Sequence, residues 1–290
     1  MEMRPELLRR LRQAQRNEIT EYHIYMRLAR SLPDPANRQI LEQIGADELR
    51  HYQAWKVHTG EDVAPDGVKV RLYYLISRVL GFTFGVRLME LGEETAQANY
   101  EEIARSIPEA ARIHDDEHEH EEQLLEMLDE ERLRYAGSVV LGLNDALVEL
   151  TGALAGLTLA LQNVQLIALS GMITGVAAAM SMAASEYLSV RAEGSHQQPL
   201  RAATYTGIAY ILTVALLITP YLLFTNFYLD LAIALTTAVL IIAAFNYYIS
   251  VAKRVPFRSR FLEMAGVSLG VAALSFGLGY LIRIWLGVAV

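Results

Sequence analysis

Residues 138–161, SVVLGLNDALVELTGALAGLTLAL, decide the fold of this chain. Only Asp145 and Glu149 carry a charge in this run. About 20 apolar residues, at a rise of roughly 1.5 Å each, span the hydrocarbon core of a bilayer. In water the same run would expose a large apolar surface. We therefore predict that it forms a transmembrane helix.

Four further apolar runs follow, so that the predicted spans cover 138–161, 164–190, 203–225, 228–251 and 261–282. The loops after the second and fourth spans hold basic residues, whereas the loops after the first and third hold none. By the positive-inside rule, the basic loops are expected in the cytoplasm. We therefore predict a multi-pass protein of the plasma (inner) membrane, with its N-terminal domain in the cytoplasm and its C-terminus outside.

The charged residues lie mostly before the first span. Residues 1–134 hold 27 of the 33 acidic and 18 of the 25 basic residues, a net charge of −9, and six of the seven histidines. This division predicts two domains, 1–134 and 135–290, in different solvents. The acidic balance favours cations over nucleic acid as partners. The chain has no cysteine, which excludes thiolate ligands. The first 16 residues lack the apolar stretch of a signal peptide, so we expect none to be cleaved.

The N-terminal domain is predicted to be helical throughout, because alternating β patterns are almost absent. Helices are expected over 5–31, 35–58 and 108–134, and within 71–106 with a break near 81–85. Two helical hairpins predict a four-helix bundle with one longer crossover. For the apolar stretch 70–91 we expect ordinary core packing, with a second bundle or the membrane surface as alternatives. The fold class is thus all-α, a cytoplasmic four-helix bundle followed by five transmembrane helices.

An internal repeat relates the two hairpins. At a constant offset of 75 residues, Glu18 corresponds to Glu93 and Tyr25 to Tyr100. At an offset of 69 residues, a Glu-x-x-His motif in the second helix corresponds to another in the fourth. The hairpins therefore look like duplicated halves.

A Glu-x-x-His motif places both side chains on one face of a helix, because residues three apart are neighbours. Two such motifs, with one glutamate from each of the other helices, provide the ligands of a carboxylate-bridged dinuclear metal site. The candidate ligands are Glu18, Glu48, His51, Glu93, Glu117 and His120. Around Glu93 the alternatives are Glu94 and then Glu90, because all three lie within about one helical turn. The repeat selects Glu93.

This pattern resembles the rubrerythrin-like branch of the ferritin-like superfamily. The resemblance implies a di-iron centre, although manganese or zinc would suit the same ligands. Tyr25 and Tyr100 look like the tyrosines found near such centres. It also implies that a ferroxidase or peroxidase activity could accompany metal binding.

The spans contain a second group of candidate residues, since charged residues within spans are costly and are functional candidates by default. Asp145 and Glu149 share one helix face, as do Met182 and Glu186. A carboxylate with a thioether suits Fe²⁺ better than Mg²⁺ or Ca²⁺, and carboxylates can take up protons when the metal leaves. These four residues form the predicted transport path. Asp230 lies at a span end, so we expect it at the membrane interface.

Two segments of the membrane domain resemble the vacuolar iron transporter family, namely GLNDALV at 142–148 and SMAASEYLS at 181–189. The resemblance implies a homodimer that exports cytosolic Fe²⁺ or Mn²⁺ in exchange for protons, with Asp145 and Met182 lining the path. The chain departs from this family at Thr174, where a glutamate is expected. It also lacks an acidic hairpin between the second and third spans, a role that the N-terminal bundle could take. The whole chain looks like a membrane-bound ferritin, a fusion of the two modules.

The sequence thus favours an iron transporter whose bundle captures, senses or oxidises iron. A membrane-anchored di-iron oxidase or peroxidase is the alternative. The expected partners are Fe²⁺, protons, the bilayer and a second copy of the chain.

Overall fold

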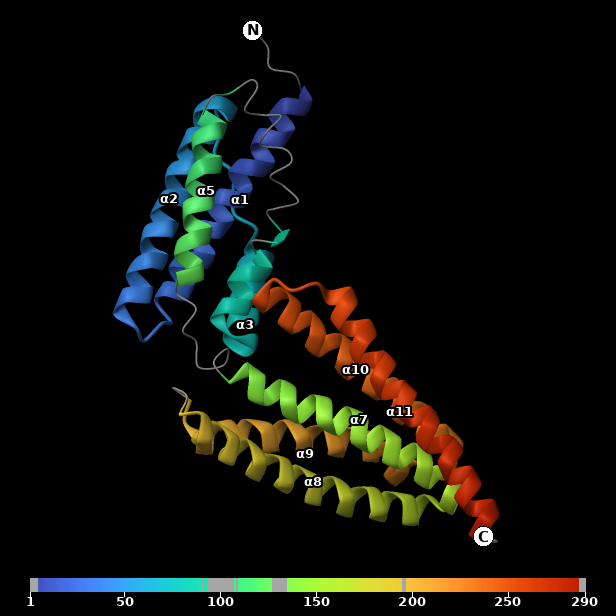
Figure 1. Ribbon diagram of the computed structural model, residues 1–290. Helices are drawn as coiled ribbons and strands as arrows, with labels where there is room; N and C mark the ends of the chain where they lie inside the picture. Colours follow the sequence, from blue (N-terminus) through green and yellow to red (C-terminus); the bar gives the residue numbers. More distant parts are fainter. Residues whose placement is uncertain are drawn as a thin grey trace. The chain divides into compact units, whose positions relative to one another are not determined.

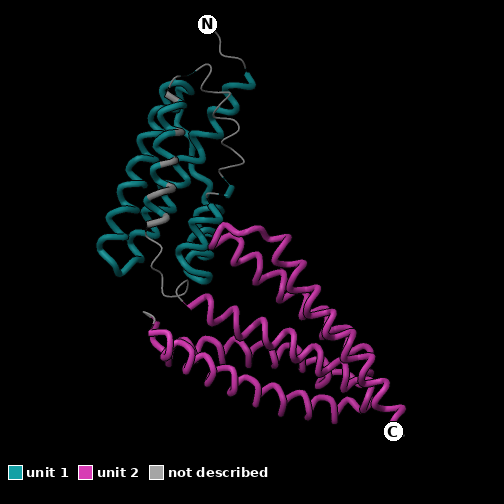
Figure 2. The backbone as a smooth tube through the Cα atoms, in the orientation of Figure 1, with its two compact units in different colours: residues 1–130 teal, residues 131–290 magenta. Residues whose placement is uncertain are grey.

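The computed structural model describes residues 5–89, 91–92, 107, 109–126, 135–194 and 197–286, and all regular secondary structure among them is α-helical (Figure 1). The all-α prediction is therefore confirmed for this part of the chain. The chain forms two compact units, residues 1–130 and 131–290 (Figure 2). Each unit is described separately below.

Unit 1 begins with a helical hairpin formed by α1 (Pro5–Ala29) and α2 (Pro35–Thr59). Asp34 starts α2, because its carboxylate accepts hydrogen bonds from the backbone N–H groups of Ala36 and Asn37 at 2.7 and 3.2 Å. Gly60 ends α2 in the left-handed conformation, with φ of 73°. The helix ends fall within two residues of the predicted ones.

The crossover contains α3 (Gly67–Leu80), which begins four residues earlier than predicted. The reason is Asp66, whose carboxylate accepts hydrogen bonds of 3.0 Å from the N–H groups of Val68 and Lys69. Gly81, with φ of 104°, ends α3, and residues 82–89 form a further helical segment. The predicted break near residue 81 is therefore confirmed. The predicted helical residues 93–106 and 127–134 lie outside the described residues.

The last described helix of unit 1, α5 (Glu109–Glu126), lies beside α2 (Figure 1). Buried apolar side chains form two clusters at different levels of α1 and α2. One contains Ile24 of α1 and Ile44 of α2, and the other contains Leu11 and Trp55. The residues between these levels along both helices include buried acidic side chains, so the unit holds a polar layer inside an apolar core.

The described part of unit 2 contains five helices that are each long and apolar enough to cross a membrane, as predicted. They are α7 (Ala136–Leu161), α8 (Val164–Glu193), α9 (Pro199–Leu223), α10 (Phe227–Lys253) and α11 (Phe257–Leu286). Large apolar side chains also cover the outside of the unit; Met180 and Leu274, for example, are 70% and 76% exposed. Such a surface suits lipid rather than water.

α7 packs closely against α9 and α11 because glycines allow the backbones to approach. A Cβ atom on Gly142 would collide with the carbonyl oxygen of Thr206 in α9. A Cβ atom on Gly279 of α11 would collide with the carbonyl oxygen of Gly156. These contacts hold the helix that carries Asp145 and Glu149 against its neighbours.

Candidate functional site

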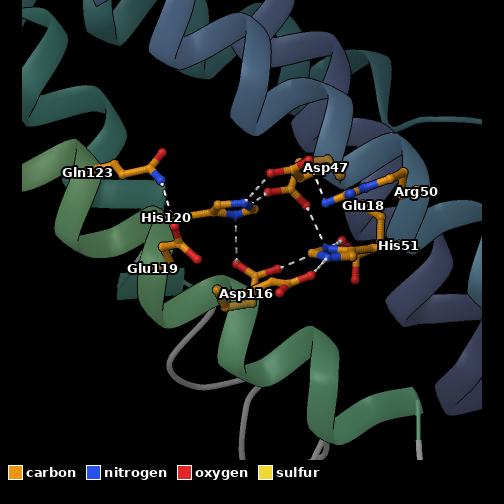
Figure 3. A network of polar contacts seen from close by, with 10 residues as sticks. Glu18, Asp47, Arg50, His51, Asp116, Glu119, His120 and Gln123 are labelled. Carbon is orange, nitrogen blue, oxygen red and sulfur yellow. Dashed lines mark hydrogen bonds and ion pairs between the residues drawn. The ribbon is translucent and has the colours of Figure 1, made fainter.

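Three helices of unit 1 bring five of the six predicted bundle ligands together in the polar layer. Glu18 comes from α1, Glu48 and His51 from α2, and Glu117 and His120 from α5. Potential ligand atoms of the first four residues lie within 4.8 Å of one another. His120 adjoins them, since its Nδ1 lies 3.3 Å from Glu48 Oε1. Figure 3 shows the two imidazole rings among these carboxylates.

Two of the glutamates lie between the two histidines. Glu48 directs Oε2 toward His51 Nδ1 at 3.7 Å and Oε1 toward His120 Nδ1 at 3.3 Å. Glu117 directs Oε1 toward His51 Nδ1 at 3.5 Å and Oε2 toward His120 Nδ1 at 4.0 Å. Glu18 approaches His51, with 3.5 Å between Oε2 and Nδ1. Three carboxylates and two imidazoles thus converge on one buried region, and such a group could hold a metal ion.

Three potential ligand atoms of the cluster are buried and make no hydrogen bond among the described residues. They are Glu48 Oε2, His51 Nδ1 and His120 Nδ1. Their contacts within the cluster are ion pairs of 3.3 to 4.0 Å, and buried polar atoms that make no hydrogen bond are rare in folded proteins. All three atoms face the space between the carboxylates. Nitrogen and oxygen ligands around a shared centre fit divalent iron, manganese or zinc.

The opposite side of each imidazole is held by an aspartate that the sequence analysis did not select. His51 Nε2 lies 3.1 Å from Asp116 Oδ2, and His120 Nε2 lies 3.2 Å from Asp47 Oδ2 (Figure 3). An aspartate that accepts the Nε2–H proton leaves Nδ1 free to bind a metal. The internal repeat could have identified these two aspartates, because an aspartate directly precedes the glutamate of both Glu-x-x-His motifs.

Trp55 is a further residue that the sequence analysis missed. This fully buried side chain donates a 2.9 Å hydrogen bond from Nε1 to Glu18 Oε1. The bond fixes one oxygen of Glu18 and leaves Oε2 directed toward His51. Trp55 lies on α2 one helical turn after His51, but an indole in a core position carries no sequence signal for this role.

The crowded carboxylates disturb the acid–base equilibria of the cluster. Burial, together with the negative charge of Glu48, raises the pKa of Glu117 to about 8. Burial likewise raises the pKa of Glu48 well above its usual range. Burial acts to lower the pKa of His51, but the carboxylates of Glu117, Glu18 and Glu48 outweigh it and raise that pKa. Without a metal, the cluster therefore holds extra protons that compensate its negative charge.

Burial also acts to raise the pKa of Glu18, but contacts with His51, Glu48 and Trp55 outweigh it and lower that pKa. Glu18 therefore stays ionised beside the positive charge of His51. A cation entering the cluster would find this carboxylate already deprotonated.

The remaining bundle residues are not part of the described site. Glu93, its alternatives Glu94 and Glu90, and Tyr100 lie outside the described residues. Tyr25 is buried in the apolar cluster around Ile24. Glu119 is exposed on α5 and accepts a hydrogen bond from Gln123, in keeping with the solvent-facing side of that helix.

In unit 2 the two predicted pairs each contact a neighbouring helix. Glu149 on α7 accepts a 2.8 Å hydrogen bond from the hydroxyl of the fully buried Tyr210 on α9. Asp145, one turn earlier, is half-buried. On α8, Met182 packs against the apolar core of the unit, while Glu186 is buried and accepts a 2.6 Å hydrogen bond from Ser138 Oγ.

No hydrogen bond or ion pair joins the α7 pair to the α8 pair in the described part of the chain. Thr174, the departure from the family pattern, is exposed on α8. Asp230, which the sequence analysis expected at the membrane interface, lies in the first turn of α10, where the protein buries it completely. Neither carboxylate oxygen of Asp230 has a hydrogen-bond partner among the described residues. Asp230 and Glu186 are therefore buried acidic residues of unit 2, whereas Asp145 is half-buried.

Comparison with known protein families gives a match to part of the membrane unit. Residues 136–198 match the model described as the VIT family, a family of iron and metal transporters. The matched segment contains α7 and α8, and thus all four residues of the predicted transport path. No curated protein and no solved structure matches the chain. The five apolar helices and this match indicate a multi-pass membrane protein that transports metal ions.

Proposed function

We propose that this protein exports Fe²⁺, or Mn²⁺, from the cytosol in exchange for protons, and that unit 1 binds the metal before transport. The observation that carries the proposal is the coexistence of two features on one chain. One is a buried group of metal-binding atoms in unit 1. The other is the VIT family match that covers the acidic helices of unit 2.

In unit 1, Glu48 and Glu117 would bridge two metal ions, with His51 and Glu18 completing one side and His120 the other. The distances between each bridging glutamate and both histidines support this assignment. By the symmetry of the repeat, Glu93 would be the terminal carboxylate on the side of His120. The site then resembles the ferritin-like centres named above. Bound iron would supply redox chemistry, so unit 1 could oxidise iron as well as capture or sense it.

In unit 2, Asp145, Glu149, Met182 and Glu186 would line the path of the ion. A carboxylate that releases Fe²⁺ can accept a proton, which links metal export to proton entry. The hydrogen bond from Tyr210 supports a defined role for Glu149, because it orients the carboxylate. Glu149 is nevertheless exposed on the surface of a single chain. An acidic side chain that faces lipid is costly, which supports a homodimer in which a second copy covers it.

The alternative function, a di-iron oxidase or peroxidase with a membrane anchor, is less well supported. An anchor needs only apolar spans, whereas unit 2 buries Glu186 and Asp230 and half-buries Asp145 among its helices. By the positive-inside rule, the basic loops of unit 2 favour a cytoplasmic location for unit 1. Unit 1 would then capture the metal in the cytosol.

Transport can be measured in proteoliposomes that contain the full-length protein. We expect Fe²⁺ flux that is driven by a pH gradient and is abolished by Asp145→Asn. Glu193→Gln is the matched control, because Glu193 is an exposed acidic residue at the end of α8. Flux that ignores the pH gradient and survives Asp145→Asn would contradict the proposal.

A further inference from the structure

The helix α3 has an apolar face that is largely exposed in the described structure. Its inner side carries Val70, Tyr73 and Tyr74, which pack on the core of unit 1. The other side carries four large apolar residues at spacings of four, three and four, which places them in one stripe. They are Val68, Leu72, Leu75 and Val79, with exposed fractions of 75%, 50%, 59% and 60%. The expected core packing thus holds for only one side of α3.

Basic residues border this stripe on both sides. At 100° per residue, Arg71 and Arg78 lie along one edge and Lys69 along the other. All three are exposed, and α3 contains no acidic residue. This positive charge is unusual for its context, because residues 1–134 carry a net charge of −9. We call the four apolar and three basic residues the basic–apolar face of α3.

A hollow between α1 and α3 extends the positive charge beyond Arg71. It encloses about 580 Å³ and is lined by Arg27, Arg30 and Arg71 together with His23. None of the described residues that line it is acidic. The guanidinium group of Arg27 lies 4.1 Å from the centre of the Tyr74 ring, which fixes it at the wall of the hollow. Three guanidinium groups around an open hollow suit phosphate groups, which arginine binds well.

We propose that the basic–apolar face of α3 docks unit 1 onto an anionic membrane surface. The apolar stripe would enter the boundary between head groups and acyl chains, while the basic borders and the arginine hollow would contact lipid phosphates. A helix with an apolar stripe and a basic polar side has the composition of an interfacial helix. The candidate membrane-spanning helices of the same chain would tether unit 1 to a bilayer that offers such a surface.

The charge of the face disfavours a second copy of the chain as its occupant. Pairing two copies through the stripes would bring their basic borders together, and like charges at an interface oppose association. The proposal goes beyond metal transport, since neither the metal cluster nor the transport path requires docking. Either inference can therefore fail without the other.

The test uses the full-length protein in lipid nanodiscs and benefits from the absence of cysteine in the natural sequence. Leu75→Cys is labelled with an environment-sensitive fluorophore, and Val79→Cys provides a second site on the same stripe. Val57→Cys is the control, because Val57 is an apolar residue of α2 that is 82% exposed. The discs contain either phosphatidylcholine alone or a mixture with phosphatidylglycerol. Each composition is prepared with and without a lipid-bound quencher.

We expect the lipid-bound quencher to quench the labels at residues 75 and 79, and to do so most strongly in the anionic discs. The label at residue 57 should stay in water. The difference in quenching between anionic and phosphatidylcholine discs should disappear in about 0.5 M salt. It should also disappear in the triple variant Lys69→Gln, Arg71→Gln, Arg78→Gln. In a background with Trp285→Phe, Trp55 fluorescence would verify that each variant keeps its fold, because Trp55 is fully buried in unit 1.

Two outcomes would overturn the proposal. One is that the labels at residues 75 and 79 are quenched in anionic discs no more than the label at residue 57. The other is shielding of the stripe that grows with protein concentration and ignores lipid charge, which would identify a second copy as the occupant.

Discussion

His51 Nε2 lies 3.1 Å from Asp116 Oδ2, and the same relationship links His120 to Asp47 at 3.2 Å. Each histidine of one hairpin is thus held by an aspartate of the other hairpin. The two contacts orient both Nδ1 atoms toward the shared carboxylates, Glu48 and Glu117. The duplicated halves therefore complete each other, since neither half supplies both a histidine and the aspartate that holds it.

Removing one of these carboxylates should weaken metal binding. For Asp116→Asn we expect an affinity about 10- to 100-fold lower than in the wild type, because a neutral amide stabilises the proton on His51 Nε2 less than a carboxylate does. Competition of Mn²⁺ or Co²⁺ against a chelator measures the affinity, and the Co²⁺ absorption spectrum reports the ligand geometry. Asp115→Asn, a change at the exposed neighbouring residue, should leave both unaltered. Equal affinities for the two variants would contradict the assigned role of Asp116.

The metal-free bundle should lose stability as the pH rises from about 4.5 to 8. Burial raises the pKa of Glu117 from 4.5 to about 8, so in this window the folded state binds a proton that the unfolded state has released. The free energy of unfolding therefore falls with rising pH. The raised pKa values of Glu48 and His51 act in the same direction. The loss should be on the order of a few kcal/mol.

Trp55 fluorescence can follow this unfolding in the presence of a chelator. Trp285, the only other tryptophan, is replaced by phenylalanine, so that the signal comes from unit 1 alone. Glu117→Gln removes one titrating group and should flatten the pH dependence. A divalent metal should restore stability at pH 8. A bundle that is as stable at pH 8 as at pH 5 without metal would disprove the expected proton uptake.

Tyr210→Phe should slow transport while leaving unit 1 unaffected. The substitution removes the 2.8 Å hydrogen bond to Glu149 and keeps the buried ring. One hydrogen bond to a charged group contributes about 1.5–3 kcal/mol, so we expect Fe²⁺ flux in proteoliposomes to fall on the order of tenfold. Tyr280→Phe changes an exposed tyrosine of α11 and should transport normally. Unchanged flux in Tyr210→Phe would remove Glu149 from the proposed path.

Gly279→Val should destabilise unit 2, because the new Cβ atom would collide with the backbone of Gly156. Overpacking of this kind costs about 1–3 kcal/mol. Gly277→Val is a matched control on the same helix, since nothing lies within 4 Å of the position of its Cβ atom. Thermal denaturation of the detergent-solubilised protein should show a lower Tm for Gly279→Val alone. Identical Tm values would contradict the close approach of α7 and α11.

The helical elements could largely be predicted from the sequence, because their signals are local. Apolar length identified five spans, and Pro35 and Gly60 marked the ends of α2. The start of α3 was missed, since Asp66 caps that helix through a side-chain contact that looks like part of a turn in the sequence. The two faces of α3 also could not be separated, because both are apolar and only the packing of unit 1 determines which one is buried.

The candidate site was predictable where the repeat constrained it. Spacing and duplication selected Glu18, Glu48, His51, Glu117 and His120, and the structure gathers these five side chains. Their role as metal ligands remains a prediction. Trp55 and Tyr210 could not be selected, because their contacts join helices whose register depends on tertiary packing. The burial of Asp230 could not be predicted, since a position at a span end does not reveal which neighbouring residues cover the side chain.

Metal analysis of the purified full-length protein tests the central claim most directly. Glu48→Gln removes the carboxylate that lies between both histidines, whereas Glu42→Gln changes an exposed glutamate of the same helix. The account predicts about two bound metal ions per chain for the wild type and for Glu42→Gln. For Glu48→Gln it predicts the loss of both ions. An unchanged metal content in Glu48→Gln would contradict a two-metal centre in unit 1.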